Sequence, residues 1–119
     1  MCIRDRSMNG VQDFYHDTFG VAKAPVVKSR VTMLSKALGV SVETLYPIAA
    51  MALEGESLIE ADEMPPQVGP RSQQTGFLPP GIALVGFDCD AIPSIATDLS
   101  NGILVMPGAT GELIELFNV

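Results

Sequence analysis

The feature that most constrains this chain is a proline-rich stretch in its middle, MPPQVGPRSQQTGFLPP (residues 64–80). Five of the nine prolines fall between residues 65 and 80, together with Gly69 and Gly76. Proline removes a backbone donor and disfavours helix, so this composition predicts an extended linker or an exposed loop. We therefore expect a helical unit at residues 8–61, a linker at 62–80 and a small sheet unit at 81–119.

Composition limits the class of protein. Hydrophobic residues make up 47% of the 119 residues and charged residues 18%, which is too apolar for a disordered chain. No apolar run approaches the roughly 18 to 20 residues that span a membrane, so no membrane partner is expected. The length suits one domain, or a small helical unit joined to a small sheet unit, and predicts an α+β or α/β fold.

Charge is distributed unevenly along the chain, whose formal net charge is −7. Residues 9–50 carry four basic and three acidic side chains, a net +1, whereas residues 51–119 carry ten carboxylates and only Arg71, a net −9. The C-terminal part should therefore repel nucleic acid and anionic surfaces.

Apolar residues before the linker recur at helical spacing. Val31, Leu34 and Leu38 predict a helix that ends at Gly39, and Ser41 suits the N-cap of a short second helix. A further helix is predicted from Pro47 to about residue 61, because proline suits the first helical position and apolar side chains recur along one face.

Short apolar runs after the linker indicate strands. GIALVGFD (81–88), ILVM (103–106) and ELIELF (112–117) predict three strands, the last after a PGATG turn. Between the first two, AIPSIATDLSNG (91–102) predicts a helix with Pro93 in its first turn and Asn101-Gly102 at its end. The expected order is β-α-β-β, with the first two strands parallel and joined by a right-handed crossover.

Residues 31–50 resemble the helix-turn-helix of bacterial and phage repressors in their packing positions. The positions that carry this resemblance are Leu34, Ser35, Leu38, Gly39, Val40, Leu45 and Ile48. The resemblance implies a second helix that enters the DNA major groove, where Arg, Lys, Asn or Gln reads base edges. None of these four types stands at the exposed positions Ser41, Val42, Glu43, Tyr46 and Pro47. Specific DNA binding is therefore not expected.

A second resemblance lies in ALVGFD (residues 83–88). This run is similar to the strand that precedes a ligand-contacting aspartate in the type I periplasmic-binding fold, which the lac-repressor family shares. That family also places a helix-turn-helix upstream, but across a much longer core than this chain has. The resemblance implies a binding module and not an intact member of the family.

Asp88, Cys89 and Asp90 follow this strand, and ligands gather at the carboxyl ends of strands in open α/β sheets. Asp88 is the expected contact for a small polar ligand. Asp90 is the second candidate, and it also suits the N-cap of the helix predicted to follow. Cys89 suits a small buried hydrophobe.

Signals for catalysis are scarce. His16 is the only histidine, with no second ligand at metal spacing, and suits a surface or hydrogen-bonded residue. The sequence does not place His16 and Cys89 together as base and nucleophile. It contains no P-loop and no G-x-G-x-x-G motif. Enzymatic activity is therefore not favoured, and no metal or cofactor is expected.

The opening MCIRDR resembles the translation of an adapter used to prepare sequencing libraries, so residues 1–7 are expected to be a non-native prefix. Without Cys2, Cys89 stands alone and no intrachain disulfide can form. The chain is then a candidate fragment of a longer protein. Its location in the cell is left open, with the cytoplasm favoured.

Together these features predict a non-catalytic regulatory or solute-binding module. Its expected partners are a small polar ligand and either a second copy or another protein. Two alternatives stay open. One is a structural or assembly subunit of a virion-like homo-oligomer, supported by low charge, few aromatics and a sheet too small to cover both its faces. The other is the C-terminal fragment of an α/β enzyme.

Binding to duplex DNA should be weak and without sequence preference, because a protein that lacks base-reading side chains offers only phosphate contacts. Competition titrations between duplexes at physiological salt measure that preference. A strong preference for one duplex would contradict this prediction and make Tyr46 or its neighbours base readers.

Overall fold

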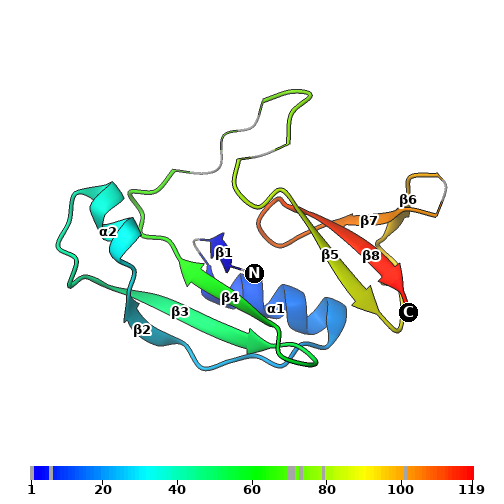
Figure 1. The fold of residues 1–119 in the computed structure, drawn as a ribbon, viewed down its shortest axis with the longest axis horizontal. Coiled ribbons are helices and arrows are strands. Elements are labelled where there is room, and N and C mark those ends of the chain that lie inside the picture. The colour runs from blue at the N-terminus through cyan, green and yellow to red at the C-terminus, as the bar shows by residue number, and fades with distance from the viewer. Residues whose placement is uncertain (1, 6, 70–71, 73, 79, 101) are drawn as a thin grey trace.

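The computed structural model describes residues 2–5, 7–69, 72, 74–78, 80–100 and 102–119. Its described residues form an α+β fold with two helices and two four-stranded sheets (Figure 1). The first sheet comes from the N-terminal half and the second from the C-terminal half. This confirms the α+β class expected from the sequence.

The first sheet has the strand order β1-β4-β3-β2. Strands β2, β3 and β4 are antiparallel neighbours, and β1 pairs with β4 in parallel. The elements of this half are β1 (Cys2–Asp5), α1 (Met8–Phe19), β2 (Val27–Arg30), α2 (Thr32–Leu38), β3 (Leu45–Ala52) and β4 (Leu58–Glu63).

The helix expected at residues 47–61 is wrong, because β3 and β4 form a hairpin there. Its turn is closed by the Leu53 amide, which donates to the Ser57 carbonyl at 3.0 Å, and contains Gly55 with φ +76°. The alanines of this stretch favour helix intrinsically, but Ala49 and Ala61 are buried as cross-strand partners in the sheet. Tertiary burial overrides the local preference.

The second helix that the helix-turn-helix resemblance implies is absent. Helix α2 does end at Gly39, which has φ +66° as a left-handed C-cap. The chain then turns and enters β3 at Leu45. Tyr46, expected on an exposed face, is buried and shares a hydrogen bond of 3.1 Å with Ser35. The region expected to be helical throughout therefore combines helices with three strands, β2, β3 and β4.

The second sheet has the order β5-β8-β7-β6. It contains the three strands that the sequence predicted and a fourth, two-residue strand. Its elements are β5 (Leu84–Cys89), β6 (Thr97–Asp98), β7 (Leu104–Pro107) and β8 (Leu113–Asn118).

The helix expected at residues 91–102 is wrong. Described residues there form a turn, in which the Ala96 amide donates to the Pro93 carbonyl, and then a hairpin between β6 and β7. The Asp98 side chain accepts from the Ser100 amide at 2.9 Å inside this hairpin turn. Of the Asn101-Gly102 pair expected to end that helix, Asn101 lies outside the described residues, and Gly102 has φ +78° just before β7.

The expected parallel pairing of the first two strands is also wrong. Strand β8 lies between β5 and β7, parallel to β5 and antiparallel to β7. The PGATG segment forms the β7–β8 turn, as predicted. Because the described residues after β5 include no crossover helix, the β-α-β-β order is replaced by four strands in which the last strand pairs with the first.

Two regions bear on the expected boundaries. Within residues 1–7, expected to be a non-native prefix, β1 pairs with β4 and the Ser7 hydroxyl accepts from the Gly10 amide as the N-cap of α1. The origin of this segment stays a prediction. Described residues between β4 and β5 form turns and no helix or strand, although β4 continues to Glu63, inside the expected linker at 62–80. The division into separate domains stays a prediction.

Helix α1 lies between the two sheets, and one core joins all three. Ser7 and the left-handed Gly20 fix its ends. Its inward face packs against both sheets, so the two halves of the chain share their apolar interior. The buried core residues are Met8, Val11, Tyr15, Ala49, Met51, Ile59, Ala61, Met106, Ile114 and Leu116.

Tyr15 and Glu112 connect α1 to the β7–β8 turn. Both are buried, and the Tyr15 hydroxyl donates to Glu112 Oε1 at 3.1 Å. The other carboxylate oxygen accepts from the Thr110 amide at 2.9 Å and the Thr110 hydroxyl at 2.5 Å. Burial, and then the charge and hydrogen bond of Glu112, raise the pKa of Tyr15, so it remains a donor. The Glu112 side chain fits here because residue 108 is glycine, and a β-carbon at that position would overlap it.

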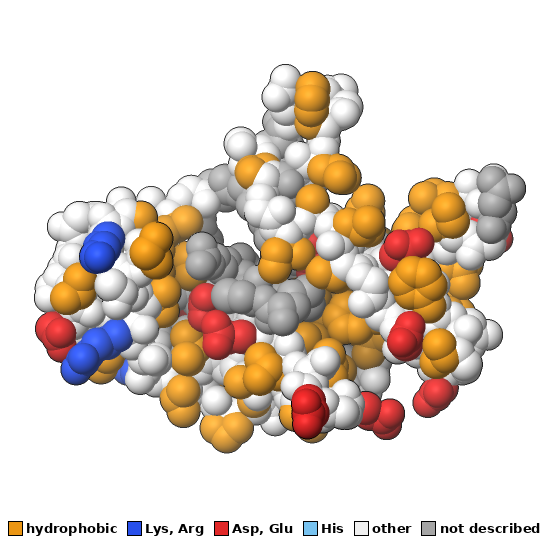
Figure 2. Space-filling model, viewed as in Figure 1, with side chains coloured by type: hydrophobic (Ala, Val, Ile, Leu, Met, Phe, Trp, Pro, Cys, Tyr) orange, Lys and Arg blue, Asp and Glu red, His pale blue; other side chains and the backbone are white. Residues whose placement is uncertain are grey.

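The molecule is longest across the two sheets, with extents of 49 × 35 × 21 Å. On the face in Figure 2, Lys and Arg side chains gather at the end that holds α2. The half that holds the second sheet displays Asp and Glu but no Lys or Arg on this face. The basic and acidic residues that are separated along the sequence are therefore also separated on this face of the molecule.

Glu112→Ala should lower the free energy of unfolding by about 3 kcal/mol, because it leaves a buried hydroxyl and a buried amide without their acceptor. Glu112→Gln should cost less, since the amide oxygen still accepts, and Tyr15→Phe should cost about 1 kcal/mol. Urea denaturation of each variant measures these losses. Equal stability of Glu112→Ala and the parent would contradict the proposed role of the buried carboxylate.

Candidate functional site

A cleft of about 1160 Å³ opens where the end of α1, the β3–β4 turn and the end of β5 come together. Its volume lies just above the range of about 300 to 1,000 Å³ that is typical of small-molecule sites. Two of its walls come from the first half of the chain and one from the second. The lining residues include both predicted site residues, Asp88 and Asp90.

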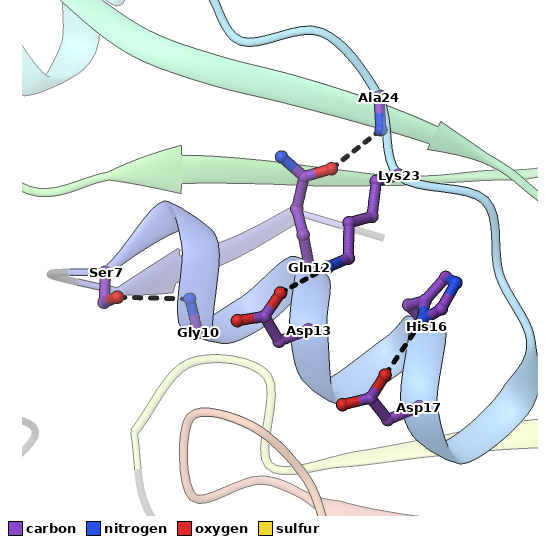
Figure 3. Close-up of polar contacts among 8 residues, drawn as sticks. All are labelled: Ser7, Gly10, Gln12, Asp13, His16, Asp17, Lys23 and Ala24. Carbon is purple, nitrogen blue, oxygen red and sulfur yellow. Dashed lines mark hydrogen bonds and ion pairs between the residues drawn. The ribbon is translucent and has the colours of Figure 1, made fainter.

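The end of α1 forms one wall because the chain reverses direction there. Gly20 has φ +71°, and its amide donates to the His16 carbonyl at 2.9 Å. This left-handed turn places Phe19 and Val21 along the cleft. The Gln12 side chain accepts from the Ala24 amide at 2.7 Å and holds the segment after the turn against the helix (Figure 3).

Aromatic packing fixes the opposite wall relative to α1. The ring of Phe87, on β5, stacks against Phe19 with centroids 5.5 Å apart and lies 6.1 Å from the ring of Tyr15. Leu53 supplies apolar surface from the β3–β4 hairpin, and the fully buried Ile59 lies beneath it. The cleft thus has an apolar floor that is continuous with the core.

The charged groups of the cleft are all acidic. Glu54, Asp88 and Asp90 line it, whereas no Lys, Arg or His stands among its described lining residues. All three carboxylates are exposed. The electrostatic potential of the cleft is therefore negative, which disfavours anions and favours neutral or cationic groups.

The structure places Asp88 and Asp90 at the same cleft, but it does not bear out the N-cap role expected of Asp90. No helix follows Asp90, so its predicted N-cap role is wrong. Side chains alternate along β5, so Cys89 shares the inward face of Phe87 while Asp88 shares the outward face of Gly86. Asp88 therefore meets the cleft at its rim, and Asp90 lies just beyond the strand end.

Cys89 is half-buried beside these acids. Its thiol contacts the Phe117 carbonyl at 3.7 Å. Burial, and then the charges of Asp88 and Asp90, raise the pKa of the Cys89 thiol above its ordinary value. The thiolate is thus disfavoured at neutral pH, which is the reverse of what a nucleophilic cysteine requires.

His16 lies away from this thiol. It is exposed on α1, where its Nδ1 lies 2.8 Å from Asp17 Oδ1, as expected of a hydrogen-bonded surface residue (Figure 3). It is not among the residues that line the cleft. Within the part of the chain that the structure describes, no three His, Cys, Asp or Glu side chains gather to hold a metal.

Sequence reasoning missed most of the cleft. Phe19, Val21 and Glu54 belong to a helix end and a hairpin turn that approach β5 only through the fold. Gly20 and Gly55 are the sequence signals for the two turns, because a glycine directly after Phe19 or Glu54 indicates a break in the helix or strand. Neither glycine indicates which distant strand the turn meets.

Comparison with protein-family models and with curated proteins finds no match to this chain. The described helices are also all too short or too polar to cross a membrane.

Cys89 should react with iodoacetamide more slowly than an unperturbed cysteine at neutral pH. The thiolate is the nucleophile, and a raised pKa shifts its appearance to higher pH. In a Cys2→Ser background, the rate of alkylation should rise with pH, and the midpoint of that rise should lie above the ordinary pKa of a cysteine thiol. Asp88→Asn with Asp90→Asn should lower that midpoint, whereas Glu56→Gln, outside the cleft, should not. An unchanged midpoint in the double variant would show that the acids do not act on the thiol.

Proposed function

We propose that this chain is a non-catalytic regulatory or solute-binding module that holds a small polar ligand in the cleft. The observation that carries the proposal is the cleft itself, with an apolar floor and three carboxylates around it. Ligand sites typically combine such apolar walls with a few polar groups that orient the ligand.

The charge of the lining defines the class of ligand. Glu54, Asp88 and Asp90 can accept hydrogen bonds from hydroxyl, amide or ammonium groups, and no basic side chain among the described lining residues would pair with an anion. The apolar floor, including Phe19 and Phe87, suits a carbon framework. A small neutral or cationic molecule with an apolar portion fits both features.

Binding is favoured over covalent chemistry by the state of Cys89. Its raised pKa keeps the thiol protonated, and no histidine lines the cleft to remove the proton. The exposed acids act in this arrangement as hydrogen-bond acceptors. The third alternative, a fragment of an α/β enzyme, would require catalytic groups from outside this chain.

An assembly subunit is the second candidate function, and a specific observation favours it. The outward face of the second sheet exposes Leu84, Leu113 and Phe117, which are 50%, 38% and 45% exposed. Exposed apolar patches on a sheet mark contact surfaces more often than free surface.

Calorimetry against a panel of sugars, primary amines and small carboxylic acids tests the binding proposal. We expect a neutral or cationic member to bind and the acids not to bind. Glu54→Gln, Asp88→Asn and Asp90→Asn should each weaken that binding by about 1 kcal/mol, or roughly fivefold in Kd, through loss of a charged acceptor at an exposed site.

Glu56→Gln is the matched control, because Glu56 lies in the same turn as Glu54 but does not line the cleft. It should leave the Kd unchanged. Binding of none of the panel, or binding of the acids alone, would overturn the proposal and leave the assembly function ahead.

A further inference from the structure

The structure carries two surfaces of opposite charge at opposite ends of the molecule. The basic end comprises Lys28 and Arg30 on β2 and Lys36 on α2, all exposed. Apolar side chains accompany them, with Met33, Val27 and Leu45 being 75%, 54% and 52% exposed.

The acidic face is the outward face of the second sheet. Alternation along β8 places Leu113, Glu115 and Phe117 on this side, and Asp88 is the register partner of Phe117 on β5. The Phe117 ring covers Gly86, where a β-carbon would lie 2.9 Å from its Cε2 atom. Because position 86 has no side chain, the Phe117 ring lies directly against the sheet. The outward face therefore combines apolar side chains with the carboxylates of Glu115 and Asp88.

Neither surface is neutralised by its own chain. Among the described residues, ion pairs join Lys23 to Asp13, Arg30 to Glu43 and His16 to Asp17. Arg30 is thus the one paired cation of the basic end, and no ion pair to Lys28, Lys36 or Glu115 is found among the described residues. The surfaces lie at opposite ends of a 49 Å axis, and charges separated by more than about 10 Å are largely screened. The two surfaces cannot therefore complement each other within one molecule.

Each surface also borders an open sheet edge. Strand β2 ends the first sheet and β5 ends the second, so each has one side without a strand partner in the described structure. Unpaired backbone groups on such edges accept a further strand from another chain. Charge, apolar surface and a strand edge thus coincide at the basic end, whereas the β5 edge of the acidic face lies toward α1 and the cleft (Figure 1).

We propose that copies of this chain associate head to tail, with the basic end of one copy against the acidic face of the next. The occupant of each surface is a second copy, because the two surfaces complement each other in charge. A contact between two different surfaces leaves one of each free, so the association continues beyond a dimer into a ring or a filament. The inference does not rest on ligand binding in the cleft, although the acidic face shares Gly86 and Asp88 with the cleft.

Sedimentation velocity of the full chain over a range of concentrations and salt tests this inference. We expect species larger than a dimer at low salt, which dissociate as salt rises. Lys28→Glu and Glu115→Lys should each weaken association by about tenfold, because each sets like charges against each other. Lys23→Glu and Glu56→Lys are the matched controls, with the same charge changes elsewhere, and should associate like the parent.

A mixture of Lys28→Glu and Glu115→Lys gives the sharpest result. The reversed end of one variant complements the reversed face of the other, so mixing should restore the association that each alone has lost. Glu115 does not line the cleft, so failure here leaves ligand binding untouched.

A protein that stays monomeric at low salt would overturn the inference. So would an association that the two reversals affect no more than their controls, or one that mixing fails to restore. A monomer that binds duplex DNA through Lys28 would instead assign the basic end to a polyanion.

Discussion

The buried hydrogen bond between Tyr15 and Glu112 is the interaction on which the rest of the structure depends. It joins α1, packed on the first sheet, to the turn that connects the last two strands of the second sheet. A buried carboxylate is stable only when its oxygens are satisfied, and here one helix side chain and one turn residue satisfy them. The arrangement specifies where the two sheets meet, which apolar packing alone would leave less defined.

Three strands of the second sheet, β5, β7 and β8, could be predicted from the sequence because each is a short apolar run bounded by turn residues. The region around Pro47 could not, since its alanines and methionines satisfy a helical period as well as a buried strand. Only the cross-strand burial of Ala49, Met51, Ile59 and Ala61 decides between the two.

The candidate site was predictable at one wall. Asp88 and Asp90 stand at the end of a recognisable strand, and the structure places both at the cleft. The other walls depend on long-range contacts that no local pattern encodes, such as the stacking of Phe19 on Phe87. Glu112 is the clearest omission. It belongs to the strand predicted at residues 112–117, where the sequence assigns it no role, and its burial follows from the Gly108 turn and the distant Tyr15.

The cleft and the central helix share the residues that surround Phe19. A molecule seated between the α1 end and β5 contacts groups that also hold the two sheets together, so its binding free energy adds to the cohesion of the whole core. The fraction of molecules with a filled cleft and the free energy of unfolding then rise together. The position of the cleft makes the resistance of the chain to unfolding a direct report of whether the site is filled.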